Sequence, residues 1–401
     1  MLTFCRVYWL SIFASMLYLF VRSCRILLQS FLFNNLSFTI DTAYLHWNTT
    51  FPTVSVCQIL NDETMADLLE REIGPIRDYK LDNVMSDIAF YGGTCYSCEY
   101  CTTEQLDCPT NLSLITEVYR LGCTSLLSDC SWQGRSFDCC QFFHPLQTEF
   151  GTCFSINSQN SKPKAAAKLI NNRYTGPGAL RFKVKEDLQV YLHDEHSVPY
   201  AFVDRALKET VLWGMQKEII FKVTELENND NVHDIAIKRR DCRFPWEFPE
   251  QSLQLYNSYS FSSCAVECSI QTQIILCNCT HHLMPRASKQ LKICDYKGLS
   301  CLTEKSGHDC PNQYLYFQLT AELAKQRKLC PCLSSCVEPE YSIVYSSDSE
   351  LESGDDLVTI RMLSLPDMRF LRNTVKTEMD LFIALGGLIG LFFGISLLTI
   401  I

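Results

Sequence analysis

The chain has 401 residues, with 35 lysines and arginines against 45 aspartates and glutamates, so its formal net charge is −10 at pH 7. This acidic balance argues against nucleic acid as a partner, because phosphate binding needs a basic surface. The length allows one large domain or two of medium size, and the 23 cysteines are far above ordinary usage.

An uncharged run at 7–21 opens the chain and is followed by Arg22 and Arg25. A secretory signal peptide is one interpretation, but no small-x-small cleavage site follows the run. We therefore predict a first transmembrane helix over 7–28, whose outer end is lengthened by snorkelling of the two arginines. Residues 1–6 would then form a residual cytoplasmic N-terminus.

The cysteines indicate the compartment, because cysteine-rich chains bind zinc in the cytosol but form disulfides when they are exported. Four N-glycosylation sequons favour export, and they begin at Asn35, Asn48, Asn111 and Asn278. A zinc site is therefore not expected, because the cysteines of an extracellular chain form disulfides. The adjacent His281 and His282 are expected to be ordinary surface residues whose side chains point apart. We predict no metal site and no cofactor.

The region between the apolar ends has the mixed pattern of an α+β fold. Alternating apolar and polar residues predict strands over 51–57, 179–194, 217–226 and 357–362, the second range holding two strands and a polar turn. Helical periodicity is clearest at 262–277 and 318–328. Residues 58–150 hold eight cysteines between Cys95 and Cys140 and little regular pattern, which predicts a peripheral lobe held by disulfides.

Two cysteine pairs have the spacing of a helix and a strand that can be joined like the rungs of a ladder. Cys264 and Cys268 lie one helical turn apart on the same face. Cys330 and Cys332 would point to the same side of an extended strand.

The number of cysteines from Cys57 to Cys336 is 21, which is odd. At least one of them must therefore be free or bonded between chains, and Cys310, in a polar loop, is our candidate. Cys5 and Cys24 lie in or near the first apolar helix and are expected to be reduced.

A second uncharged stretch runs over 381–401, and its 21 residues would span about 31 Å as a helix, enough to cross a bilayer. Gly386, Gly390 and Gly394 recur every four residues and give this helix one face without side chains. Such a face lets helices approach closely in lipid, either around a pore or in a plain receptor dimer.

Two acidic residues, Glu378 and Asp380, precede this stretch and are expected just outside the helix. They would raise the local cation concentration at a pore mouth. The alternative is an ordinary solvated helix start.

Motifs spread over nearly the whole chain resemble the degenerin/epithelial sodium channel family, most closely its insect pickpocket branch. In chain order they are Arg6-x-x-Trp9, FPTVSVC (51–57), GCTSLLSDCSWQG (122–134), TEFGTCFSIN (148–157), RDCRFPWE (240–247), the block at 259–285, CPCLSSC (330–336) and GGLIGLFFGIS (386–396).

The resemblance implies a multi-pass plasma-membrane subunit of a trimer, formed by this chain alone or with related subunits. Its extracellular domain at 29–379 would comprise palm, finger, knuckle, thumb and β-ball, with a finger-like lobe at 58–150 and a thumb-like disulfide ladder at 242–336. A second transmembrane helix would occupy 380–401. The family's cytoplasmic His-Gly motif and a glutamate expected after the last residue are missing, which we interpret as a partial gene model.

The resemblance also implies disulfides. Cys57 would pair with Cys153, and Cys130 with either Cys139 or Cys140. The thumb would hold Cys242–Cys336, Cys264–Cys332, Cys268–Cys330, Cys277–Cys301 and Cys279–Cys294.

In function, the resemblance implies a voltage-independent, sodium-preferring cation channel that amiloride-type blockers inhibit and that an extracellular cue gates. Gly394, Ile395 and Ser396 would form its selectivity filter, with Gly386, Gly387 and Gly390 in helix packing. Hence no enzymatic activity is expected. The alternative is a cysteine-rich receptor on a membrane anchor that never conducts; a cleaved N-terminus, leaving a single-pass protein, would favour it.

Overall fold

A computed structural model describes residues 2–33, 36–43, 47–103, 107–163, 168–250, 252–286, 291–305, 332–337, 339–350 and 357–394. The chain divides into two compact units. One unit comprises 1–42, 226–242 and 368–401, and the other comprises 43–225 and 243–367. Cys310 and the helix expected at 318–328 lie outside the described residues.

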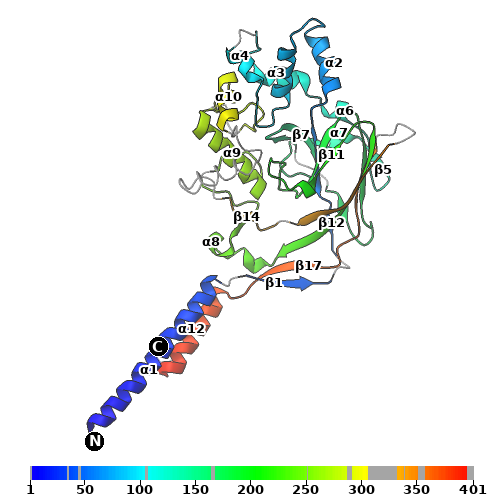
Figure 1. Ribbon diagram of the computed structural model, residues 1–401. Helices are drawn as coiled ribbons and strands as arrows, with labels where there is room; N and C mark the ends of the chain where they lie inside the picture. The colour runs from blue at the N-terminus through cyan, green and yellow to red at the C-terminus, as the bar shows by residue number, and fades with distance from the viewer. Residues whose placement is uncertain are drawn as a thin grey trace. The chain divides into compact units, whose positions relative to one another are not determined.

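The larger unit contains two β-sheets that share one hydrophobic core (Figure 1). In the first sheet the strands follow the order β12, β16, β9, β4 and β5, and β15 also pairs with β12. Their bounds are β12 Met215–Asn228, β16 Leu357–Met362, β9 Ala179–Val184, β4 Leu127–Trp132, β5 Arg135–Phe137 and β15 Glu340–Glu350. The strands expected at 217–226 and 357–362 are confirmed, and the structure shows that they pair in parallel as β12 and β16.

The second sheet is antiparallel throughout, in the order β11, β10, β3, β7 and β6. Its strands are β11 Lys208–Val211, β10 Leu188–His193, β3 Thr53–Gln58, β7 Gly151–Ile156 and β6 His144–Thr148. The two strands expected within 179–194 therefore belong to different sheets. The strand expected at 51–57 is confirmed as β3, but its alternating pattern does not mean that one face is exposed, because every residue of β3 is buried.

Both faces of β3 are buried for different reasons. Val54 and Val56 belong to the core shared by the sheets. On the opposite face, the Ser55 hydroxyl lies 2.7 Å from Nε2 of His193, also buried. In β3 the alternation of apolar and small polar residues therefore reflects two buried faces, one apolar and one polar.

The region at 58–150 is more regular than its sequence predicts. It contains α2 Asp62–Glu72, α3 Tyr79–Ala89, α4 Cys98–Thr103, α5 Leu112–Tyr119, α6 Cys123–Leu126 and α7 Cys139–Phe142. Side chains at Asn61, Asp78 and Asn111 cap the first turns of α2, α3 and α5. From 127 onward the region supplies β4, β5 and β6 to the two sheets, so only its first part forms a helical lobe.

The helix expected at 262–277 is confirmed as α9, Phe261–Cys277. Ser260 and Ser263 form a capping box at its start, and Asn278 ends it in the left-handed conformation with φ +56°. The shorter α10, Tyr296–Lys305, packs beside it (Figure 1).

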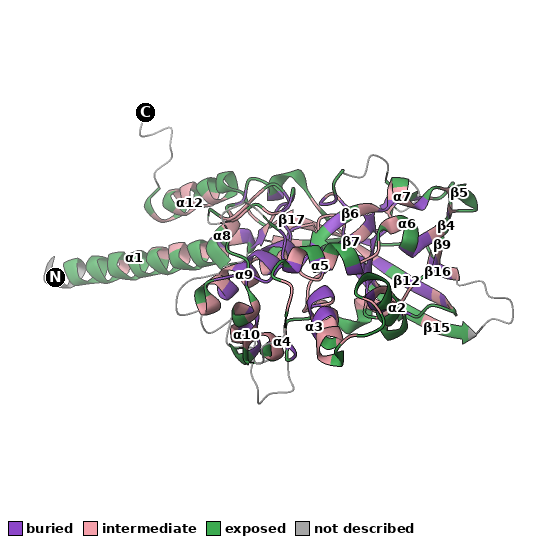
Figure 2. Ribbon diagram, turned by 90° about the horizontal axis from the view of Figure 1, so that it is seen from above, coloured by how far each residue is buried: buried purple, intermediate pink, exposed green. Residues whose placement is uncertain are grey.

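The smaller unit contains the two apolar helices and a strand pair. Helix α1 covers Leu2–Phe33 and is followed by β1 Leu36–Asp41, and α12 covers Glu378–Phe393 and is preceded by β17 Arg369–Thr374. The two strands pair antiparallel from Leu36↔Thr374 to Asp41↔Arg369. Both helices are mostly exposed along their length (Figure 2).

The remaining elements are short. They are β2 Thr49–Thr50, β8 Ile170–Asn171, η2 Arg205–Leu207, η3 Asp230–Val232, α8 Ile237–Arg240, β13 Cys242–Arg243 and β14 Ser334–Ser335.

Candidate pore helices and disulfide framework

Among the described residues, one helix is long and apolar enough to cross a membrane, the segment Arg6–Phe33 of α1. Most of its described large apolar side chains are exposed; Trp9, for example, is 64% exposed. Helix α12 packs against α1, with the ring of Phe20 at 5.7 Å from Phe392 and 4.9 Å from Phe393, edge to face in both cases. The two apolar stretches from opposite ends of the chain thus form a pair.

Helix α12 begins at Glu378, so Glu378 and Asp380 lie in its first turn and not outside the helix as predicted. One carboxylate oxygen of Asp380 accepts hydrogen bonds from the backbone N–H and the hydroxyl of Thr377, at 2.8 and 2.9 Å. The Thr377 hydroxyl in turn accepts from the N–H of Asp380. Thr377 is therefore the N-cap residue and Asp380 completes a capping box with it, while the Glu378 side chain is exposed.

The far end of α12 differs from the unbroken helix expected to Ile401. The last helical residue is Phe393, and Gly394 follows in the left-handed conformation with φ +67°. Its N–H donates to the carbonyl of Gly390 at 2.9 Å. Glycine takes this conformation without steric cost, which is why the helix ends at this position. Ile395 and Ser396 lie outside the described residues.

The glycines of α12 leave open space. A Cβ atom added to Gly386 or Gly387 would meet no other heavy atom within 4 Å. Exposed apolar side chains surround them, among them Ile383 and Leu391 at 66% and 75% exposure. This surface can therefore receive lipid or another helix at short distance.

The C-terminal end of α1 is held by basic residues that the sequence did not single out. Phe31 is buried near the end of this helix and lies under the Arg239 guanidinium of α8, which is 3.9 Å from the centroid of its ring. Nη2 of Arg239 also donates to the carbonyl of Phe31 at 3.2 Å. Just before α12, Lys376 donates to the Ser30 hydroxyl at 3.1 Å. The only feature of the sequence that pointed to the Arg239 contact was the run of three basic residues at 238–240.

Disulfides stiffen the larger unit. Cys57–Cys153 joins β3 to β7, and Cys264–Cys332 joins α9 to the segment before β14. Cys277–Cys301 and Cys279–Cys294 tie the end of α9 to α10 and its preceding segment. These are pairings that the resemblance implied. Cys242, Cys268 and Cys336 are also disulfide-bonded, and Cys330 lies outside the described residues.

A family model described as amiloride-sensitive sodium channel matches residues 1–401, the whole chain. The chain belongs to this family. Sodium channel protein Nach of Drosophila virilis is 24% identical over 318 residues, which cover 73% of this chain and 78% of the relative. The human bile acid-sensitive ion channel is 25% identical over 311 residues, 69% of this chain and 56% of the relative. Pickpocket protein 28 of Drosophila melanogaster is 21% identical over 355 residues, 70% and 55% respectively.

These matches confirm the resemblance to the degenerin/epithelial sodium channel family and its pickpocket branch. Members of the amiloride-sensitive sodium channel family are ion channels of the plasma membrane and not enzymes. The apolar helix pair and the disulfides of this chain are therefore best interpreted as parts of a channel subunit.

The sequence left open whether Cys130 pairs with Cys139 or with Cys140, and the structure settles this choice. Cys130 pairs with Cys139, and the neighbouring Cys140 pairs with Cys123. Two further bridges, Cys95–Cys98 and Cys101–Cys108, hold the helical lobe. Cys24 in α1 is free, as expected for the apolar helix.

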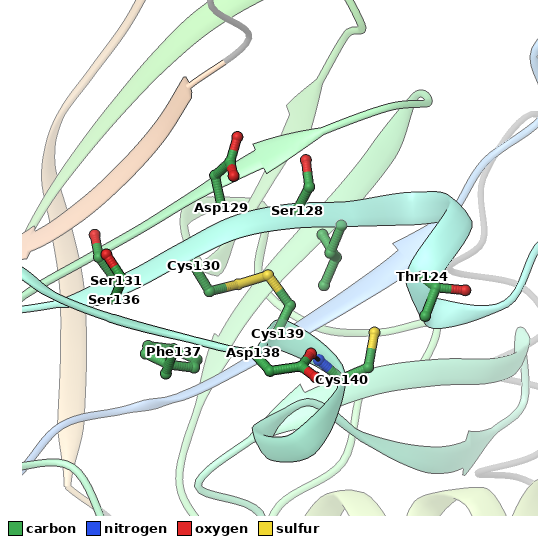
Figure 3. A pocket seen from close by; sticks show the side chains of 11 residues that line it. Thr124, Ser128, Asp129, Cys130, Ser131, Ser136, Phe137, Asp138, Cys139 and Cys140 are labelled. Carbon is green, nitrogen blue, oxygen red and sulfur yellow. Dashed lines mark hydrogen bonds between the residues drawn. A yellow bond between two sulfur atoms is a disulfide. The ribbon is translucent and has the colours of Figure 1, made fainter.

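A hollow of about 630 Å³ lies beside the Cys130–Cys139 bridge, between β4, β5 and the start of α7 (Figure 3). Its two carboxylates are already engaged. Asp138 accepts from the N–H of Cys140 at 3.1 Å, and Asp129 lies 3.3 Å from the Lys183 ammonium. The lining of the hollow therefore offers a ligand hydroxyl groups and a disulfide, while both carboxylates already have partners within the protein.

The interpretation of His281 and His282 as surface residues is wrong, because each is only 6% exposed. The ring of Tyr91, just after α3, packs on His281 at 4.9 Å, and Nε2 of His282 lies 2.8 Å from the carbonyl of Ile88. Burial lowers the pKa of His281 to about 3 and that of His282 to about 4. Both are therefore neutral packing residues near pH 7.

Three of the four sequon asparagines are described, and all three are exposed: Asn48, Asn111 and Asn278. Asn35 lies outside the described residues. The side-chain oxygen of Asn111 caps α5 by accepting a hydrogen bond from the N–H of Leu114 at 3.3 Å. The exposure of these residues is compatible with glycosylation.

Proposed function

We propose that this chain is the pore-forming subunit of a voltage-independent, sodium-preferring, amiloride-sensitive cation channel gated by an extracellular cue. The observation that carries this proposal is the family match over the whole chain, including the glycine-rich α12. The subunit would assemble as a trimer, with copies of itself or with related subunits.

In the proposed topology, α1 and the segment 380–401 cross the plasma membrane and 29–379 is extracellular, with the finger-like lobe at 58–150 and the thumb-like ladder at 242–336. The disulfides and the exposed sequon asparagines support this orientation, because both chemistries belong to the exported side of a membrane.

The proposed pore lies along α12. Gly386, Gly387 and Gly390 would let three helices approach, and carbonyl oxygens of Gly394, Ile395 and Ser396 would replace water around a sodium ion. The end of α12 at Phe393 supports this arrangement, because the last carbonyls of a helix have no partner within the helix. Glu378 would lie exposed at the outer mouth and attract cations.

Voltage clamp of cells that express the chain tests the proposal, with surface delivery checked by glycan digestion. A sodium current that amiloride blocks is expected. Surface protein that gives no current, alone or with related subunits, would instead favour a receptor that does not conduct.

A further inference from the structure

Helix α1 has two unlike faces, and the first of them packs within the smaller unit. The ring of Phe20 contacts the last two phenylalanines of α12. The helical period places Cys24, Leu27 and Phe31 on the same face as Phe20, and these side chains are partly or fully buried. This face of α1 is therefore covered by protein.

The opposite face of α1 carries a polar stripe within an apolar helix. The stripe comprises Tyr18, Arg22, Arg25 and Gln29, which follow one another at intervals of three or four residues and are all exposed. Gln29 comes about two and a half turns after Phe20, so the stripe lies opposite the face that meets α12. Its polar side chains therefore point away from the helix pair.

The two arginines of the stripe have no anionic partner in the protein. In the ranges that the structure describes, neither guanidinium makes a hydrogen bond or an ion pair. A second copy of the chain offers no carboxylate at this depth, because 2–33 and 381–401 contain no aspartate or glutamate. An unpaired arginine beside hydrocarbon is costly, so the partner must come from outside the chain.

The arginines lie within reach of the water side of the helix. Lys376, which donates to the Ser30 hydroxyl at 3.1 Å, and the exposed Glu378 mark a charged level at Ser30. Along the helix axis, Arg25 lies about 8 Å and Arg22 about 12 Å before Ser30. Arginine side chains extend toward lipid headgroups from such depths by snorkelling along the helix.

We propose that Arg22 and Arg25 bind the phosphate group of a phospholipid in the leaflet at the C-terminal end of α1. Each guanidinium presents a fork of donors that matches two phosphate oxygens, and the two side chains lie one turn apart on one face. One turn nearer to water, the Gln29 amide donates to the same headgroup. The site rests on the proposed topology, in which α1 crosses the membrane, but it does not require conduction.

A polar stripe also suits a second membrane helix. Two neighbouring positive charges favour the phosphate instead, because a partner helix would itself have to bury a carboxylate in the hydrocarbon. A phospholipid carries its negative charge at the headgroup level, where the snorkelling guanidinium groups end.

Native mass spectrometry of the full chain in detergent, titrated with lipid, tests the site. The probes are dioleoyl phosphatidylglycerol and dioleoylglycerol, which share their acyl chains, and only the first has a phosphate. Arg22→Gln combined with Arg25→Gln removes the proposed ligands, and the corresponding lysine pair keeps both charges. Arg135→Gln combined with Arg173→Gln, at exposed positions of the larger unit, removes the same charge elsewhere and is the matched control.

We expect the glutamine pair to bind phosphatidylglycerol about tenfold more weakly than the wild type does, and to bind dioleoylglycerol equally. The lysine pair should keep most of the affinity, which separates loss of the ligands from misfolding, and the control pair should match the wild type.

Equal binding of phosphatidylglycerol by the wild type and the glutamine pair would overturn the site and leave the stripe to a second membrane helix. An equal loss in the control pair would overturn it too, because net charge alone would then account for binding. The intact mass shows whether 2–33 are retained. A protein that has lost them would contradict the proposed topology, an outcome distinct from a retained α1 that binds no phosphate.

Discussion

Arg239 holds Phe31 in two ways, with its guanidinium 3.9 Å from the ring centroid and Nη2 donating to the Phe31 carbonyl at 3.2 Å. The last turn of an α-helix has carbonyls without partners in the helix, so this arginine satisfies one of them while covering the aromatic ring. The C-terminal end of α1 is thereby fixed to α8.

Replacing Arg239 should loosen the end of α1. Arg239→Ala removes a cation–π contact and a charged hydrogen bond, which together contribute about 2 kcal/mol. A double-mutant cycle with Phe31→Leu, read by thermal unfolding in detergent, should show a coupling of about 1 kcal/mol. The neighbouring Lys238→Ala, an exposed residue of the same helix, serves as control. Equal effects of both alanine variants would contradict the assigned contact.

Lys217 of β12 is buried between two carboxylates, Glu209 of β11 at 2.9 Å and Asp348 of β15 at 3.0 Å. Burial lowers the pKa of this lysine, but both carboxylates raise it and leave a net rise. Lys217→Ala should therefore cost about 3 kcal/mol in the free energy of unfolding, because two acids lose their shared cation. Lys217→Met, which keeps the volume, should cost less. Urea unfolding measures both, and a Lys217→Met variant as stable as the wild type would show that only packing matters.

The buried histidines predict an acid-sensitive stability. The folded-state pKa of His281 lies below its ordinary value of 6.5, so the unfolded chain binds the proton more tightly. Stability should fall as the pH drops from 6.5 toward 3, by up to about 1.4 kcal/mol per pH unit. His281→Phe keeps a ring against Tyr91 and should flatten this slope in unfolding curves between pH 7 and 4.5. An unchanged slope would assign the acid sensitivity to other groups.

Two disulfides of very different span offer a matched comparison. The Cys57–Cys153 bridge closes a sequence separation of 96 residues, and Cys95–Cys98 closes one of 3. In the chain-entropy model, serine pairs at these sites should cost about 4.7 and about 2 kcal/mol. Denaturant unfolding of the two double variants gives the comparison. A larger loss at the short bridge would mean that local structure, and not chain entropy, dominates.

Sequence predicted the parts of this fold whose signals are local. The strands within 217–226 and 357–362 alternate over their length, and α9 carries its own capping serines. The family motifs added the pairings that join distant cysteines, such as Cys57 with Cys153.

What sequence missed depends on residues far away along the chain. His281 and His282 are buried because Tyr91 and Ile88 cover them from the end of α3. Adjacent Cys139 and Cys140 are equivalent in sequence, and only the turn at α7 shows which one meets Cys130. Helix α12 ends where Gly394 adopts a positive φ, and the uninterrupted apolar sequence around this glycine does not indicate a helix end there.

The reversal potential of the amiloride-blocked current tests whether the residues after α12 select sodium. With sodium outside and potassium inside, we expect a positive reversal potential that moves toward zero in Ser396→Cys and stays unchanged in Ser11→Ala, an exposed residue of α1. A current whose reversal potential is the same in all three proteins would contradict the assignment of Gly394, Ile395 and Ser396 as the filter.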